Sequence, residues 1–104
     1  MNLQKLVTLI ASGKYKEAYK KLSKIAKRSP RNADAWFLLS FVYQKQRQQV
    51  YSLEKALQAD KGHKFAAKRL HEINTSAANL TPITSFYPPE TLKKKPTPVL
   101  KIIS

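Results

Sequence analysis

The chain lacks cysteine, long apolar runs and any abundance of acidic residues. Without cysteine it cannot form disulfides, thiolate metal sites or thiol nucleophiles. Its longest strongly apolar stretch, Trp36–Tyr43, falls far short of the roughly 20 residues that a membrane-spanning helix needs. We therefore expect no transmembrane segment and no disulfide scaffold, and a length of 104 residues leaves no room for a large enzyme.

Positive charge dominates what is present. Twenty Lys and Arg residues face only six Asp and Glu residues, which gives a formal net charge of +14. The hydrophobic share of 42% is enough for a modest core. Because net charge informs about partners more than about fold, the composition indicates a small basic binding module.

Apolar side chains recur at helical spacing in five segments, which predicts an all-α fold. The predicted helices cover residues 2–12, 14–28, 33–44, 48–59 and 64–74. The third is apolar over most of its circumference, so we expect it to form the buried centre. Two antiparallel hairpins and a fifth, capping helix would result.

Local signals mark the ends of these helices. Asn2 and Asn32 are suited to N-caps, because their side chains accept hydrogen bonds from free backbone N–H groups. Gly13 can end the first helix and Pro30 follows the second. The stretch from Met1 to Gly13 is too short in its apolar part for a signal peptide, so we expect a cytoplasmic protein.

The last third of the chain has a different composition. Every proline except Pro30 lies after position 80, which divides the chain into a helical domain at 1–74 and an extended tail at 75–104. The tail carries Phe86–Pro89, a lysine run at 93–95 and a β-prone close at 98–103. Such a tail could dock on its own domain, thread into an assembly or remain disordered.

Two turns repeat about 31 residues apart, at Ser29–Asn32 and Asp60–His63, and each separates two predicted helices. Around them the sequence resembles the tetratricopeptide repeat, including small bacterial members with shortened turns. The family pattern is W-x2-L-G-x2-Y, then A-x3-F and a closing proline. The matching residues are Trp36, Leu39, Ser40 and Tyr43, followed by Ala18, Leu22 and Pro30 from the preceding repeat.

The resemblance covers about residues 3–73 and has departures. The central repeat is shorter than the family's 34 residues, and Lys45–Gln49 replaces the usual glycine turn. Lys61 stands where the closing proline is expected. The resemblance implies stacked helical hairpins, in which Trp36, Leu39 and Tyr43 serve packing.

In the tetratricopeptide family the first helix of each hairpin lines a concave groove that receives a peptide. The resemblance implies an apolar groove with exposed phenylalanines, and Arg69 near its rim. Leu3, Val7 and Leu38 occupy positions where a carboxylate clamp would need polar groups. The partner-groove residues would be Asp34, Phe37, Phe41, Lys45, Phe65, Lys68, Arg69 and Glu72.

A second candidate surface is the basic face of the helix at 14–28. Glu17 is the only acid in residues 1–32, so little pairing relieves the repulsion among the cations. An acidic protein, RNA or anionic lipid head groups would complement this face. Its residues are Lys14, Lys16, Lys20, Lys21, Lys24, Lys27 and Arg28.

No residue pattern indicates catalysis, a metal site or a cofactor. His63 and His71 lack partners at a useful spacing, and we expect both at the surface. The first hypothesis is a non-catalytic protein-interaction module that binds a protein or peptide in the apolar groove, aided by the basic face. Self-association is an alternative way to cover the open ends of so short a stack. The second hypothesis is a ribonucleoprotein-associated protein that contacts phosphates through lysines.

Overall fold

The described part of the chain folds into six helices joined by short loops. The computed structural model describes residues 2–76 and 78–88. Its helices are α1 (Leu3–Ala11), α2 (Tyr15–Arg28), α3 (Ala33–Val42), α4 (Gln46–Ala59), α5 (Lys64–Asn74) and α6 (Ile83–Phe86). These residues contain no β-strand, which confirms the all-α prediction for this part. The bounds of α1–α5 lie within two residues of those predicted from the sequence.

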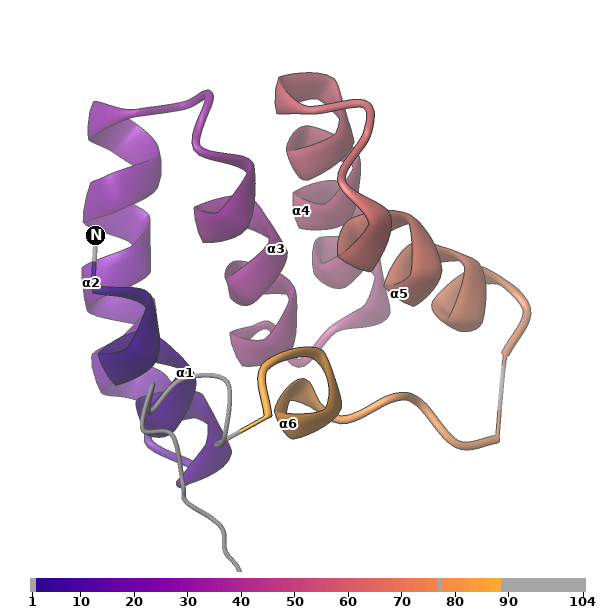
Figure 1. Ribbon diagram of the computed structural model, residues 1–104, viewed down its shortest axis with the longest axis horizontal. Helices are drawn as coiled ribbons and strands as arrows, with labels where there is room; N and C mark the ends of the chain where they lie inside the picture. The colour runs from indigo at the N-terminus through magenta and orange to yellow at the C-terminus, as the bar shows by residue number, and fades with distance from the viewer. Residues whose placement is uncertain (1, 77, 89–104) are drawn as a thin grey trace, which may run out of the picture.

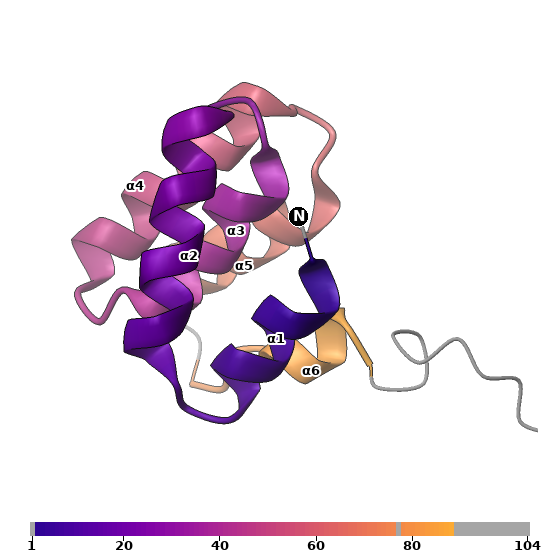
Figure 2. The ribbon, with the colours of Figure 1, turned by 90° about the vertical axis from the view of Figure 1, so that its left-hand side faces the viewer.

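From α1 to α5, consecutive helices pack on one another. In Figure 1, α2, α3 and α4 lie side by side and are joined at alternating ends, and α5 leans against α4. Helix α1 contacts α2, α3 and also α6, which follows it by more than 70 positions (Figure 2). None of the helices in the described residues is long and apolar enough to cross a membrane.

Three helices begin with a side-chain cap. The Oδ1 atoms of Asn2 and Asn32 accept hydrogen bonds from the backbone N–H groups of Lys5 and Ala35, both at 3.1 Å. At the start of α5 an imidazole does the same, because Nδ1 of His63 accepts from the backbone N–H of Ala66 at 3.1 Å. Each cap satisfies an N–H group that has no partner inside the helix.

Helix α3 is the centre of the core, as its apolar circumference predicts. Its Phe37, Leu38 and Leu39 side chains are fully buried, together with Leu22 of α2 and Leu53 of α4. The reason is that α2 and α4 cover opposite sides of α3, so few of its positions reach water.

For residues 78–88 of the predicted tail, docking on the chain's own domain is the alternative that the structure supports. The expected extended conformation does not hold at residues 83–86, which form α6. The sequence analysis missed α6, a single helical turn that starts directly after Pro82. Ile83, Phe86 and Tyr87 are buried against the other helices. We call residues 80–88 the docked segment. The lysine run at 93–95 and the β-prone close at 98–103 lie outside the described residues.

Candidate functional site

The predicted partner groove, here called the inner face, is filled by the chain itself. The ring of Phe86 in the docked segment lies 5.2 Å from the ring of Phe37 and 5.1 Å from that of Phe65, measured between centroids. It lies 6.2 Å from the ring of Phe41. These spacings are typical of aromatic pairs in protein cores. A partner would have to displace the docked segment to reach the inner face.

This arrangement corrects the expected exposure of the three phenylalanines. Phe37 is 0% exposed, because α6 and neighbouring helices surround it, while Phe41 is half-buried. Phe65 alone keeps substantial exposure, at 37%. Tyr87 packs on Phe37 and Phe65, with ring centroids 6.2 and 5.4 Å apart. Burial, and then the nearby negative charge of Asp34, raise the pKa of the Tyr87 hydroxyl.

Glu72 anchors the docked segment at its beginning. Its Oε1 accepts a hydrogen bond from the backbone N–H of Thr81 at 3.0 Å, and its Oε2 accepts from the Thr81 hydroxyl at 2.7 Å. Oε2 also lies 3.3 Å from the Lys68 ammonium. The hydrogen bonds from Thr81, followed by the contact with Lys68, lower the pKa of the Glu72 carboxyl. Charge-assisted bonds of this kind fix an extended segment in one register.

Arg69 was predicted at the rim of the groove and instead lies inside, with 5% of its surface exposed. Its Nε donates to the Ser40 hydroxyl at 2.8 Å, and its Nη2 donates to the Ser40 carbonyl at 3.1 Å. The guanidinium stacks on Phe41, 3.8 Å from the ring centroid. Burial lowers the pKa of Arg69 to about 10, so the group stays charged at neutral pH.

The position of Ser40 explains why a cation is buried at this point. Ser40 lies in the last turn of α3, where carbonyl groups lack partners within the helix and the helix dipole is negative. The Arg69 guanidinium supplies donors and positive charge to that helix end. Arg69 therefore joins α5 to α3 and is a structural residue.

Asp34 and His63 form a second link between α3 and α5. Nε2 of His63 lies 2.7 Å from Oδ1 of Asp34, and the His63 side chain is only 8% exposed. Because Nδ1 accepts the Ala66 N–H, the ring proton of the neutral imidazole belongs on Nε2 and points to Asp34. The expectation that His63 is a surface residue is wrong, since it caps α5 and bridges two helices.

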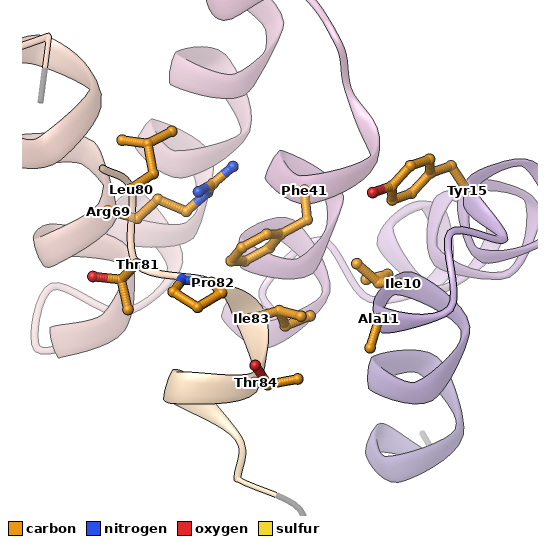
Figure 3. A pocket seen from close by; sticks show the side chains of 10 residues that line it. All are labelled: Ile10, Ala11, Tyr15, Phe41, Arg69, Leu80, Thr81, Pro82, Ile83 and Thr84. Carbon is orange, nitrogen blue, oxygen red and sulfur yellow. The ribbon is translucent and has the colours of Figure 1, made fainter. Parts of the chain in front are cut away.

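The remaining groove candidates are peripheral. Lys45 is the exposed residue before α4, and Lys68 is exposed over 56% of its side chain. A cavity of about 330 Å³ lies at the seam between the docked segment and α1, α2, α3 and α5. Figure 3 shows the side chains that line it. Phe41 and Arg69 line it together with Ile83, so the docked segment fills most of the inner face and leaves a cavity beside α1.

The basic residues of α2 form the opposite surface, here called the outer face. All seven predicted cations lie on α2 or immediately before it, and all but the half-buried Lys21 are exposed. None of the seven has an ion pair with another described residue. Their charges are therefore compensated by solvent and salt alone within the described chain. Those residues are Lys14, Lys16, Lys20, Lys21, Lys24, Lys27 and Arg28.

A groove of about 420 Å³ runs beside these cations, between α2 and α4, with α3 as its floor. We call it the outer groove. The Tyr19 and Tyr43 rings lie 6.0 Å apart, and the Trp36 and Tyr51 rings lie 6.1 Å apart. Tyr19 is 45% exposed and Tyr51 is 52% exposed. Burial, followed by the neighbouring tyrosines, raises the pKa of the Tyr43 hydroxyl.

Cations frame the outer groove. Lys27 lines the α2 wall, and the Lys55 ammonium lies 5.6 Å from the centroid of the Trp36 ring and 6.0 Å from that of Tyr51. The indole N–H of Trp36 donates to the Pro30 carbonyl at 2.9 Å, which fixes the ring in the floor. Among the residues that the structure describes, no acidic side chain lines this groove.

The sequence analysis assigned Trp36 and Tyr43 to packing and missed the outer groove. Its rings come from three helices and span more than 30 positions, so no linear motif joins them. One signal was present: Tyr19 lies at the border between the apolar side of α2 and its lysines. An exposed aromatic ring at such a position indicates a surface that contacts something other than the core.

Comparison with known proteins identifies no relative. No family model, no curated protein and no solved structure matches the chain. Within the described residues, no group of three or more His, Asp or Glu side chains is arranged to hold a metal ion. The geometry of the two faces is therefore the basis for a functional proposal.

Proposed function

We propose that this chain is a non-catalytic interaction module, with its helices stacked as in a tetratricopeptide repeat, and that it binds an anionic partner through the outer face. The observation that carries the proposal is the cluster of seven α2 cations with no ion pair among the described residues. An anionic surface would supply the missing counter-charges and release bound salt ions on docking.

The inner face supports this choice of surface. The apolar groove that the family resemblance implies holds Phe86 and Tyr87 of the same chain, and both are buried. A peptide partner would have to replace those contacts and the Thr81–Glu72 hydrogen bonds. The outer face needs no such exchange, because its cations already face solvent.

Charge reversal tests the proposal. In the full chain, the triple variant Lys16→Glu, Lys20→Glu and Lys24→Glu should lose most of its affinity for heparin, a polyanion without bases. The matched control is the triple variant Lys5→Glu, Lys61→Glu and Lys64→Glu, whose three lysines are exposed and lie outside α2. Both variants change the net charge equally. Equal elution of the two variants from heparin at the same salt concentration would contradict a binding role for α2.

A further inference from the structure

The outer groove places aromatic rings and cations side by side. Tyr19 and Tyr51 expose about half of their surfaces on opposite walls, and Trp36 lies between them in the floor. At about 100° per residue, Lys16, Lys20 and Lys27 fall within roughly 100° of Tyr19 around the α2 axis. Lys27 lines the groove, and Lys16 and Lys20 lie on the adjoining side of α2, so these three lysines and the rings of the groove are neighbours on one surface.

Each half of this surface matches a different part of a single nucleic-acid strand. Lysine ammonium groups attract phosphates without reading sequence. Exposed aromatic rings stack on unpaired bases, which all present a flat π-face. The groove has a volume of about 420 Å³. None of the described residues that line it is acidic, so its lining would not repel a phosphate backbone.

Peptide ligands fit this surface less well. Strand addition needs a free sheet edge, and the described residues contain no strand. A proline-rich peptide docks on aromatic rings but brings no charge for the lysines. An acidic peptide would engage the lysines but leaves the tyrosine rings without a stacking partner.

We propose that the outer groove binds single-stranded nucleic acid, with bases stacked on Tyr19 and Tyr51 and phosphates on Lys16, Lys20 and Lys27. The inference rests on the proposed function, since it names the anionic partner of the same face. Stacking adds a requirement for rings that heparin binding does not have.

Fluorescence of Trp36, the only tryptophan, provides a direct readout. Ten-nucleotide oligouridylate and oligothymidylate should each quench it, and polyglutamate of equal charge should not. The comparison of the two oligonucleotides shows whether RNA or DNA is the better ligand. Tighter binding and stronger quenching by polyglutamate than by either oligonucleotide would overturn the inference in favour of an acidic protein partner.

Ring-removing variants separate stacking from charge. Because stacking contributes about 1–3 kcal/mol per base, Tyr19→Leu with Tyr51→Leu should weaken oligonucleotide binding at least about tenfold. The salt concentration at which the variant elutes from heparin should not change. The control Tyr15→Leu removes a ring of similar exposure, 44%, that lines the seam cavity instead. Tyr19→Phe with Tyr51→Phe keeps both rings and should bind as the unmodified chain does.

The outcomes distinguish the two proposals. Unchanged oligonucleotide affinity in the leucine variant, with heparin binding still lost on lysine reversal, would overturn stacking and leave the basic face intact. Heparin binding that survives lysine reversal would overturn the proposed function itself. A leucine variant that loses its helical circular dichroism is replaced by Tyr51→Leu alone, which changes the most exposed of these rings.

Discussion

The inner and outer faces both gather aromatic side chains, yet the chain itself covers most of only one of them. On the inner face Phe86 completes a cluster with Phe37 and Phe65, and hydrogen bonds hold the adjoining backbone. On the outer face Tyr19 and Tyr51 remain about half exposed beside unpaired lysines. The comparison teaches that aromatic content alone does not locate a binding surface. What matters is whether the chain supplies its own cover.

The docked segment also covers apolar side chains that the other helices leave open. An apolar helix face that no other segment covers leaves its side chains in contact with water, which is unfavourable. Ile83, Phe86 and Tyr87 cover such a face from within the chain. The docked segment therefore adds to the hydrophobic core, and its contacts on the inner face contribute to the stability of the fold.

The largest expected effect comes from breaking the inner face. Phe86→Ala removes a buried ring from the aromatic cluster and should lower the free energy of unfolding by about 3 kcal/mol. Tyr51→Ala on the outer face should cost well under half as much, because Tyr51 is 52% exposed. Urea denaturation of both variants measures the contrast. Equal losses would contradict the distinction between a covered and an open face.

Arg69 offers the second test of the inner face. Arg69→Ala leaves the Ser40 hydroxyl and carbonyl without their donors and removes the stacking on Phe41. We expect a loss of about 2 kcal/mol in the free energy of unfolding, from the desolvated acceptors. Arg69→Lys should recover only part of it, since an ammonium cannot reproduce the two-donor geometry. Full recovery by lysine in thermal unfolding would show that charge alone matters.

His63 should have a smaller effect, because it acts at one helix end. His63→Ala removes both the cap of α5 and the bridge to Asp34, and should cost about 1 kcal/mol. His63→Asn keeps an N-cap acceptor and should cost less. Chemical denaturation compares the two variants, and a greater loss for asparagine than for alanine would exclude a capping role.

The smallest expected effect on stability comes from the Glu72 carboxylate, and this effect depends on pH. Its pKa is lowered in the folded protein, chiefly by the bonds from Thr81, so its contribution to stability is present above the carboxyl's ordinary pKa and is lost as the pH falls through the folded value. The amide resonance of Thr81 should report this loss in an NMR titration from pH 6 downward. In Glu72→Gln that titration step should be absent; its persistence would assign the step to another group.

Much of the fold follows from local sequence signals. Apolar spacing locates α1–α5 to within two residues. Asn2, Gly13, Pro30 and Asn32 mark ends of α1, α2 and α3, whereas α2 and α4 begin without a side-chain cap. Helix α6 has only four residues after a proline, too few to show a periodic pattern. Its burial depends on contacts with α1 that are remote in sequence.

The sites were harder to predict for the same reason. Phe37 was placed on an exposed groove because its cover, Phe86, lies 49 positions away in a proline-rich region. Arg69 was placed at the rim because the family resemblance implies that position, and the helix end at Ser40 that accepts it is a property of the packed structure. The basic face, in contrast, depends on one helix, and its exposure was predictable from spacing alone.

Amide-shift mapping by NMR tests the contrast between the two faces most directly. On addition of ten-nucleotide oligouridylate to the full chain at low salt, we predict shifts along α2 and the start of α4 and at the Trp36 indole N–H. Resonances of Thr81, Phe86 and Tyr87 should stay in place. Shifts confined to the docked segment and α5, with α2 unchanged, would contradict an open outer face and a covered inner one.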